Sequence, residues 1–582
     1  MNTYQKVVLG TAKTVSYGLF GVIIGYLFMV SIFSTCVMSY TDEHIFFVKD
    51  FAILMVVGIS VFLLLCSFLR KAFSKMSKWG YRAGTIFWFA LLLALIFTIN
   101  FRPQYDPGSV YDAAGSLLRG DYSPWQQGGY LYTFPFQNGL VFLELPFWLL
   151  LGEKAYLGIQ IYNLILWYMT ILGLCYLAKE YFGESTAKLT YIALLLFIPM
   201  WAYVTYCYGT VPGLFFSVLA MCFEHRYEKS GKWRELLFCG LCLFLAVMYK
   251  SNYEIFAIAV GIMLLMHGIR NKTWKSMVGV VMALAFVMAE VKCIPYIMHL
   301  ITGANTGNGI PMIAWMAMGL RESNIAPGWY NRFTVLAYEE CQYNISAVAQ
   351  MSIAAMKESF ASFAANGAYC ISFFGRKIAS MWSSPEWECF TTINKMNVSG
   401  TLPYWMKDIL YNGGIVNTVL LLLLDVFQSA IYCMVLIYLL QSGKKVRLEH
   451  AVLLITFLGG FIFHLIWEGK CQYSIPYYVI LFPYAAKGLE DATAYLRLFL
   501  QRFRDKGISK KQLCKETVTT TKGKITGIVL AAILILSVVN SSLLQSTIKL
   551  QADTGEWIYF MQNSTQWKNE DFYFGDSYYS NQ

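Results

Sequence analysis

The stretch FRPQYDPGSVYDAAGSLLRGDY, residues 101–122, carries residue types that could do chemistry. Two of its three carboxylates, Asp106 and Asp112, come shortly after a long apolar run. A carboxylate held beside a hydroxyl can act as a general base, because it accepts the proton while the hydroxyl attacks. The same aspartates could be ordinary solvated loop residues, so the elements around them must decide between the two interpretations.

The composition predicts a helical membrane protein. The chain has 582 residues, of which 57% are hydrophobic and 14% are charged, whereas soluble globular proteins carry about 25% charged residues. Apolar runs long enough to cross about 30 Å of hydrocarbon recur along the chain. The net charge of +11 is concentrated in short loops between these runs, as expected for signals of orientation. We therefore expect membrane lipids, and no nucleic acid, as partners.

The charges of the loops predict the orientation. The segment TDEHIFFVKD (41–50) is acidic on balance, and RKAFSKMSKWGYR (70–82) is strongly basic. The positive-inside rule then puts the N-terminus in the cytoplasm, with a retained first helix, and residues 101–137 outside. About 13 crossings are expected in total. Of the four apolar stretches within 138–224, either one does not cross or two form one broken helix.

The expected fold class is an all-α polytopic membrane protein. Its predicted parts are N-terminal helices at 1–83, a transmembrane core at 84–300, a large outside region at 301–414, C-terminal helices at 415–489, a basic cytoplasmic loop at 490–524, and a last helix with an outside tail at 525–582. The outside region lacks a long apolar run, so short and amphipathic helices are expected there. No internal repeat is visible, which weakens a transporter interpretation.

Asp106 follows the predicted membrane helix at 84–100 on the outside. Pro107 and Gly108 come next and predict a turn. Residues 109–118 have an apolar stripe at helical spacing, which indicates a short helix lying in the membrane interface. Asp106 would then stand at the outer interface, between a membrane helix and a surface helix.

These residues resemble the first outside loop of the GT-C superfamily of membrane glycosyltransferases, which includes the protein-mannosyltransferase-like and aminoarabinose-transferase-like enzymes. The residues that carry the resemblance are Asp106, Tyr111, Ala114 and Gly120-Asp121, followed by TFPFQNGL (133–140) and LLLGEKAY (149–156). The chain departs from the family in having Asp106-Pro107 where Asp-Glu is common. It also has two helices ahead of the loop where the family usually has one.

Two later stretches add to the resemblance. GLCLFLAVMYKSNYEIF (240–256) is similar to the family's glycine-containing hairpin that ends in a lysine, here Lys250. Residues 464–489 resemble its late element Glu-x-x-x-Arg-Tyr-x-x-Pro, which Glu468, Tyr473 and Pro476 match. Gln472 takes the place of the arginine, and Lys470 lies two residues earlier. Residues 309–331 resemble the long outside loop of Gram-positive bacterial members.

The resemblance implies an enzyme that takes a sugar from a polyprenyl-phosphate carrier. The sugar would pass to an extracytoplasmic acceptor, which is a cell-envelope glycan, a lipid or a protein. It implies inverting displacement with Asp106 as the general base, in the cell membrane, at a site on the extracytoplasmic face. The leaving phosphate needs fixed positive charge nearby, and Lys250, Arg321 and Lys470 are the main candidates.

Each candidate for substrate binding has an alternative. Asp112 could orient the acceptor or be solvated, and Lys250 could pair with Glu254 one helical turn away. Glu468 and Tyr473 could line the site, or Glu468 could make a structural hydrogen bond to His464. No third ligand has suitable spacing for a metal site with those two residues. The resemblance also implies no metal, so no cofactor is expected.

Aromatic residues are frequent in both outside loops. Most are expected to anchor the protein at the membrane interface, and Trp382, Trp387 and Trp405 are candidates for stacking on a sugar ring. Two other functions stay open from the sequence: a transporter or flippase of a lipid-linked sugar, and a scaffold of a wall-assembly complex. A flippase would move lipid without forming a glycosidic bond, which distinguishes it from an enzyme.

Overall fold

The computed structural model describes residues 2–38, 45–74, 77–305, 309–397, 402–410, 414–443 and 446–506. Most of the described chain is helical. The predicted last helix and tail at 525–582 lie outside the described residues, as does most of the basic loop at 490–524.

The N-terminal part holds three long helices and a small hairpin. Its elements are α1 (Thr3–Phe33), β1 (Ser34–Met38), β2 (Ile45–Lys49), α2 (Ala52–Ser74) and α3 (Lys78–Ile99). The two strands pair antiparallel, with Ser34 opposite Lys49, and their β-branched and aromatic residues favour that state. The hairpin was not predicted. It lies against residues 301–414, which we call the outer region after the side that the sequence predicts for them. There the Cys36 amide donates to the Ser383 carbonyl at 2.9 Å.

The core consists of helices joined by short 3₁₀ turns. In chain order they are α4 (Tyr105–Leu118), η1 (Ser123–Trp125), α5 (Tyr130–Thr133), η2 (Pro135–Gln137), α6 (Asn138–Leu151), η3 (Gly152–Lys154), α7 (Ala155–Phe182), α8 (Glu184–Leu195), α9 (Ile198–Val204), α10 (Thr210–Ser230), α11 (Trp233–Tyr249), η4 (Ser251–Tyr253), α12 (Glu254–Asn271) and α13 (Trp274–Thr302). One of the four apolar stretches within 138–224 is broken, because α8 and α9 are bent by 60° relative to one another.

The outer region is built from short helices, as predicted. They are α14 (Met312–Gly319), α15 (Phe333–Glu340), α16 (Ile345–Ala365), α17 (Gly367–Trp382), α18 (Cys389–Met396) and α19 (Tyr404–Leu410). The chain continues through α20 (Ile415–Ser442), η6 (Leu448–His450), α21 (Val452–Ile466), α22 (Cys471–Val479) and α23 (Phe482–Lys506). The last part of the C-terminal helices expected at 415–489 is divided between two helices, α22 and α23.

Among the described residues, seven helical segments are long and apolar enough to cross a membrane, or eight if the bent pair counts as one span. One of the seven, residues 135–182, contains two of the four apolar stretches of the core. The helix α21 is apolar but shorter. The multi-pass architecture is confirmed, whereas the expected count of 13 crossings is not.

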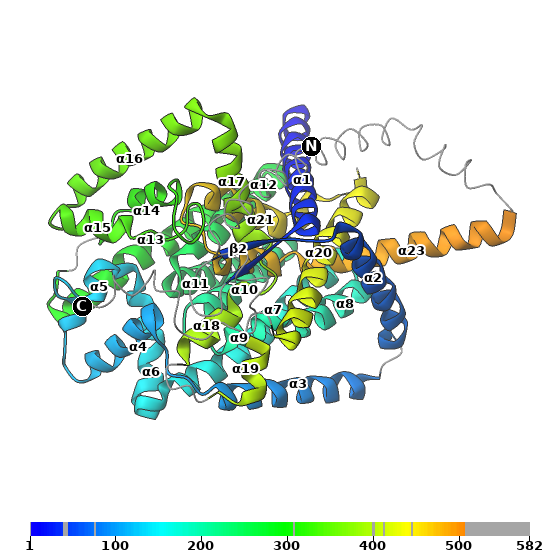
Figure 1. The fold of residues 1–582 in the computed structure, drawn as a ribbon. Helices are drawn as coiled ribbons and strands as arrows, with labels where there is room; N and C mark the ends of the chain where they lie inside the picture. Colours follow the sequence, from blue (N-terminus) through cyan, green and yellow to red (C-terminus); the bar gives the residue numbers. More distant parts are fainter. Residues whose placement is uncertain are drawn as a thin grey trace.

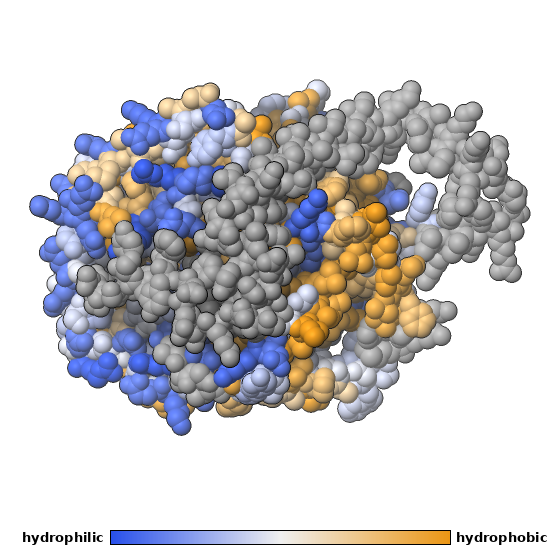
Figure 2. Space-filling model, viewed as in Figure 1, coloured by the Kyte–Doolittle hydropathy of each residue, from blue (hydrophilic) through white to orange (hydrophobic). Residues whose placement is uncertain are grey.

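The two ends of the molecule differ in polarity. The elements α4, α5, α14 and α15 gather at one end, and α23 extends from the opposite end (Figure 1). In the same view, hydrophilic residues are frequent at the first end and hydrophobic residues cover the region of α2 and α20 (Figure 2). Exposed apolar side chains on α2 include Ile53, Val57 and Leu64. Such a surface fits contact with lipid.

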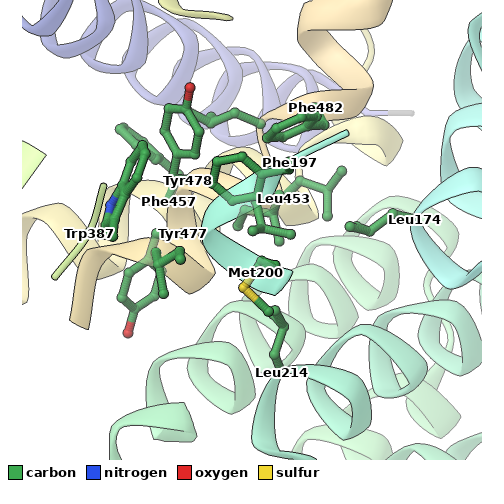
Figure 3. Close-up of a cluster of buried hydrophobic side chains, with 14 of the residues drawn as sticks. Leu174, Phe197, Met200, Leu214, Trp387, Leu453, Phe457, Tyr477, Tyr478 and Phe482 are labelled. Carbon is green, nitrogen blue, oxygen red and sulfur yellow. The ribbon is translucent and has the colours of Figure 1, made fainter. Parts of the chain in front are cut away.

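The core packs where α9, α21, α22 and α23 meet. Phe197 lies against Trp387, Tyr478 and Phe482, with ring centroids 5.3–5.6 Å apart (Figure 3). Trp387 is 1% exposed, and its indole N–H donates to Ser474 Oγ at 3.1 Å.

This packing overturns two of the predictions about sugar stacking. Trp382 and Trp387 are core residues, 2% and 1% exposed, whose rings no sugar reaches. Hydropathy cannot tell a buried tryptophan from one at the membrane interface, because both environments favour its large apolar surface. Trp405 is 56% exposed and remains a candidate.

Candidate active site

Asp106 stands in the first turn of α4. The helix begins at Tyr105, which adopts the left-handed conformation (φ 55°). Pro107 fits the first turn, where its missing N–H costs no hydrogen bond. The turn expected at Pro107-Gly108 is therefore the beginning of a helix. A carboxylate is favoured at this position by the positive end of the helix dipole.

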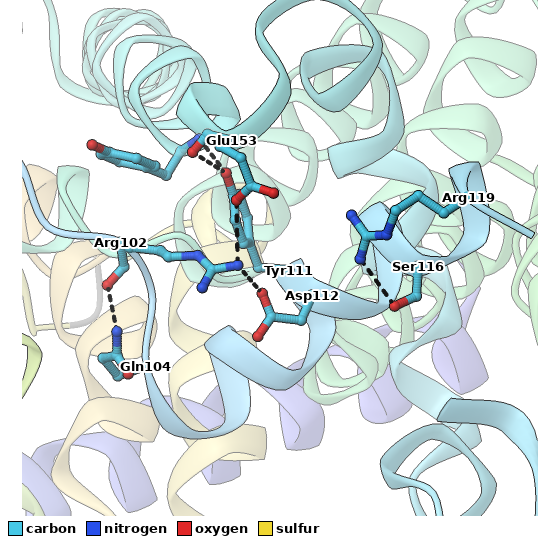
Figure 4. A network of polar contacts seen from close by, with 8 residues as sticks. Arg102, Gln104, Tyr111, Asp112, Ser116, Arg119 and Glu153 are labelled. Atoms are coloured by element: carbon cyan, nitrogen blue, oxygen red, sulfur yellow. Dashed lines mark hydrogen bonds and ion pairs between the residues drawn. The ribbon is translucent and has the colours of Figure 1, made fainter. Parts of the chain in front are cut away.

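Asp112 takes part in a different contact. It lies six positions after Asp106, so the two side chains point to different sides of α4. The Arg102 guanidinium donates to Asp112 at 2.6 Å and lies 3.5 Å from Glu153 in η3 (Figure 4). Tyr111 reinforces the link, because its hydroxyl donates to the Glu153 carbonyl at 3.1 Å. The structure thus gives Asp112 an ion-pair partner that joins α4 to its neighbours.

A network of tyrosines and one glutamine surrounds Asp106. The Asp106 carboxylate is hydrogen-bonded to Tyr130 of α5. Gln137 Nε2 donates to the hydroxyl of Tyr130 at 3.1 Å and to that of Tyr208 at 2.6 Å. Burial raises the pKa of Tyr130 well above its usual value, and the negative charge of Asp106 adds to the shift. Asp106 therefore has neutral hydroxyls beside it.

Lys250 reaches the same network from the other side. It follows the last residue of α11, and its ammonium donates to Thr210 Oγ1 at 3.0 Å. The ammonium also lies over the rings of Tyr208 (4.9 Å) and Tyr473 (5.2 Å). Burial, and next the charge of Lys470, lower the pKa of Lys250 to about 7. Lys250 does not form the alternative pair with Glu254, because η4 separates the helices α11 and α12 to whose ends the two residues belong.

Glu468 and Lys470 lie between α21 and α22, and Tyr473 stands in the first turn of α22. Lys470 forms an ion pair with Glu388 at 3.1 Å, and Tyr473 donates to Glu468 Oε2 at 3.2 Å. Asp106 acts electrostatically on Tyr473, and both Asp106 and Lys470 act on Tyr206. Five of the predicted site residues, Asp106, Lys250, Glu468, Lys470 and Tyr473, are thus brought into one cluster, which we call the outer cluster.

A buried lysine holds the chain that carries Glu468 and Lys470. Lys377 of α17 is 0% exposed. Its ammonium donates to the carbonyls of Gly319 at 2.5 Å, Leu465 at 3.1 Å and Trp467 at 2.7 Å. These carbonyls belong to the C-terminal ends of α14 and α21, where a cation is favoured. Lys377 was not predicted, because only the fold brings these two ends together.

Other members of the outer cluster were also missed. They are Tyr130, Gln137, Tyr208 and Glu388. Gln137 lies in the stretch TFPFQNGL (133–140) that carries part of the resemblance, but no role was predicted for it, and the other three stand in no motif. A weak signal existed for Glu388, since WECF puts a carboxylate in an otherwise apolar stretch, and buried carboxylates are rare unless paired.

Arg321 is not brought into the outer cluster. Its guanidinium lies over the ring of Phe333, 5.1 Å from the centroid, and lines a separate hollow between α14, α15 and α16. Next to Lys250, a cavity of about 10 Å³ bordered by Gln472 and Tyr473 has room for about one water molecule. This cavity is too small for a phosphate, which would have to bind at the opening of the cavity.

No group of three His, Cys, Asp or Glu side chains within the described residues could hold a metal ion. The expected absence of a metal stays a prediction. His464 is buried and stacks on Tyr473, with ring centroids 5.8 Å apart. The burial of His464 and its stacking on Tyr473 indicate a structural role rather than contact with a substrate.

Comparisons with known proteins bear on this site. Residues 142–298 match the family model described as dolichyl-phosphate-mannose-protein mannosyltransferase. That segment runs from α6 to α13, so it includes Lys250 but neither Asp106 nor Lys470. A comparison with curated proteins gives no match.

Similar solved structures include the archaeal oligosaccharyltransferase AglB from Archaeoglobus fulgidus, in complex with an inhibitory peptide and a dolichol-phosphate. It shares 13% identity over 80% of this chain and 56% of its own, with a TM-score of 0.36. The apo form of the oligosaccharyltransferase from the same organism shares 14% identity over 82% of this chain and 60% of its own, with a TM-score of 0.37. The chain thus spans less than two thirds of their length. The family match over residues 142–298 confirms the resemblance of the chain to the GT-C superfamily of membrane glycosyltransferases.

Proposed function

We propose that the chain transfers a sugar from a polyprenyl-phosphate carrier to an acceptor hydroxyl at the outer face of the cell membrane. The observation that carries the proposal is the outer cluster, in which the Asp106 carboxylate and the two lysines Lys250 and Lys470 meet around shared tyrosines. A carrier needs such a site at the edge of the membrane, because its tail stays in lipid while its phosphate is at the interface.

Asp106 is the proposed general base. Its position at the N-terminus of α4 leaves it exposed, so an acceptor hydroxyl can reach it. The acceptor oxygen attacks the anomeric carbon while its proton passes to Asp106 and the bond to the carrier phosphate breaks. The attack inverts the configuration at that carbon. Tyr130 holds the carboxylate in place through its hydrogen bond.

Lys250 and Lys470 are the proposed partners of the leaving phosphate. Fixed positive charge stabilises the charge that develops there as the bond breaks. Glu388 holds Lys470 at 3.1 Å, and Thr210 holds Lys250 at 3.0 Å. Glu468 and Tyr473 shape the floor of the site through their own hydrogen bond. Asp112, held by Arg102, keeps a positioning role in this account.

The test compares wild type and Asp106→Asn in the native host, at matched membrane levels. Asn keeps the size of the side chain but cannot accept the proton. Loss of one envelope modification, with accumulation of its polyprenyl-phosphate donor, would support the proposal. An unchanged glycan profile would refute it and would favour a flippase.

A further inference from the structure

The outer region contains a hollow of about 420 Å³ that the proposed mechanism does not use. It lies between the turn after α14 and the helices α15 and α16, and Arg321, Phe333 and Glu340 are among its lining residues. Sites for small molecules typically measure about 300 to 1,000 Å³. The hollow therefore has the size of a site for one small ligand or one unit of a larger one.

Fixed polar contacts build its wall. Arg376 of α17 donates to both carboxylate oxygens of Glu322, at 3.3 and 2.7 Å. Asn331 donates to the Glu322 carbonyl at 3.1 Å and accepts from the Phe333 amide at 3.1 Å. Glu322 and Asn331 are thus engaged within the protein. A wall held in this way binds a ligand without first having to become ordered.

Two charged side chains of the hollow are not engaged in this way. Within the described part of the chain, the Arg321 guanidinium contacts the Phe333 ring and makes no hydrogen bond or ion pair, and the exposed Glu340 carboxylate makes none either. A guanidinium offers donors only, and a carboxylate offers acceptors only.

A ligand with hydroxyl groups satisfies both, because a hydroxyl both donates and accepts. An anionic ligand would be repelled by Glu340, and a cationic one by Arg321. The lining therefore favours a neutral, hydroxyl-rich ligand. The ring of Phe333 adds an apolar face of the kind on which a sugar can pack.

The hollow is joined to the outer cluster through the backbone. The Gly328 amide donates to the Arg321 carbonyl at 2.8 Å, and the Gly469 amide donates to the Gly328 carbonyl at 2.7 Å. Gly469 stands between Glu468 and Lys470 in the sequence. A ligand in the hollow would thus lie beside the strip of chain that carries two residues of the outer cluster.

We propose that this hollow is a subsite for a neutral saccharide unit of the acceptor. This inference rests on the proposed function. An acceptor arrives from outside, where α14, α15 and α16 lie at the hydrophilic end (Figures 1 and 2). The sugar of the donor, by contrast, is tied to a phosphate that the proposed function puts beside Lys250 and Lys470.

The test uses the purified full-length chain and the variants Arg321→Ala and Lys357→Ala. Lys357 is a matched control, because it is an exposed cation of α16 that does not line the hollow. The donor is the polyprenyl-phosphate-linked sugar extracted from the host. The acceptor is a fraction of oligosaccharides released from its envelope by enzymatic digestion. Transfer is followed by mass spectrometry while the acceptor concentration is varied.

Arg321→Ala should need about tenfold more of the oligosaccharide fraction for half-maximal transfer, while the KM of the donor stays unchanged. In the absence of oligosaccharides, water can replace the acceptor hydroxyl and slowly release free sugar, and this release should be equal in wild type and Arg321→Ala. A raised KM of the donor alone would assign the hollow to the donor. An acceptor response equal to that of Lys357→Ala would overturn the proposal.

Failure of the proposed function has a different signature. Wild type would then neither transfer nor release sugar, whatever residue stands at position 321. The hollow can be tested in that case by ligand-observed NMR with the same oligosaccharide fraction. Binding that Arg321→Ala and Glu340→Gln both abolish would support the saccharide subsite, and equal binding by wild type and both variants would refute it.

Discussion

Replacing Lys377 with Met should destabilise the outer region strongly. The ammonium donates to three carbonyls, those of Gly319, Leu465 and Trp467, and it is 0% exposed. Met keeps the length and apolar stem of the side chain but offers no donor. Each buried carbonyl left without a donor costs about 1 to 3 kcal/mol. Relief of the desolvation cost of the ammonium offsets part of that loss. We therefore expect a net loss near the lower end, about 3 kcal/mol.

The assay is thermal unfolding of the purified protein in detergent, followed by intrinsic fluorescence at one fixed heating rate. Lys357→Met is the control, because this exposed lysine stands on the adjacent helix α16. Exposed substitutions of this kind change stability by about 0.5 kcal/mol or less. Lys377→Met should unfold several degrees below both wild type and Lys357→Met. Equal unfolding midpoints for the two variants would refute the stabilising role of the hydrogen bonds from Lys377 to the ends of α14 and α21.

Three further predictions concern the outer cluster and its supports. If a charged Lys250 binds the carrier phosphate, the KM of the donor should rise as pH increases through about 7, because the Lys250 ammonium then loses its charge. In Lys250→Arg the KM of the donor should stay constant from pH 6 to 9. A rise in Lys250→Arg as steep as in wild type would contradict this role. Lys470→Met should lower donor turnover at least about tenfold, and Glu388→Gln should lower it less, because Lys470 keeps its charge in that variant. Equal turnover in wild type and Lys470→Met in a donor-release assay would exclude a role of Lys470 in binding the phosphate. Gly209→Ala should lower both stability and turnover, because a Cβ there would overlap the Tyr249 carbonyl oxygen and push Tyr208 away from Lys250. Gly261→Ala is the control, because a Cβ at that position meets nothing within 4 Å. Equal melting temperatures and turnover in the two variants would contradict the close packing of Gly209 against Tyr249.

The sequence sufficed for the parts of the fold that follow from local pattern. Apolar runs predicted the multi-pass helical class, and the lack of such runs predicted the short helices of the outer region. It did not predict that Pro107 would open a helix, because proline suits both a turn and a first helical turn. The hairpin β1–β2 was also missed, since short apolar runs do not distinguish a strand from the end of a helix.

The site could be predicted only where a motif marked it. Asp106, Lys250, Glu468, Lys470 and Tyr473 stood in recognisable stretches, and the fold brings all five together. The partners that hold them came from elsewhere, as with Glu388, which is 82 positions before Lys470 in the numbering yet pairs with it at 3.1 Å. Such long-range contacts leave no periodic trace in one sequence. Asp112 could not be assigned to Arg102 for another reason: the two are ten positions apart, which is not the i, i+3 or i, i+4 spacing that a helix brings together.

The most direct test of the central claim is the activity of Asp106→Asn in a purified system. Donor extracted from the host is incubated with wild type and variant, with and without envelope oligosaccharides, and the released carrier phosphate is measured. A general base typically contributes about 10² to 10⁴ in rate, so the variant should lose at least about a hundredfold while its melting temperature stays unchanged. Carrier release at the wild-type rate by Asp106→Asn would contradict the account.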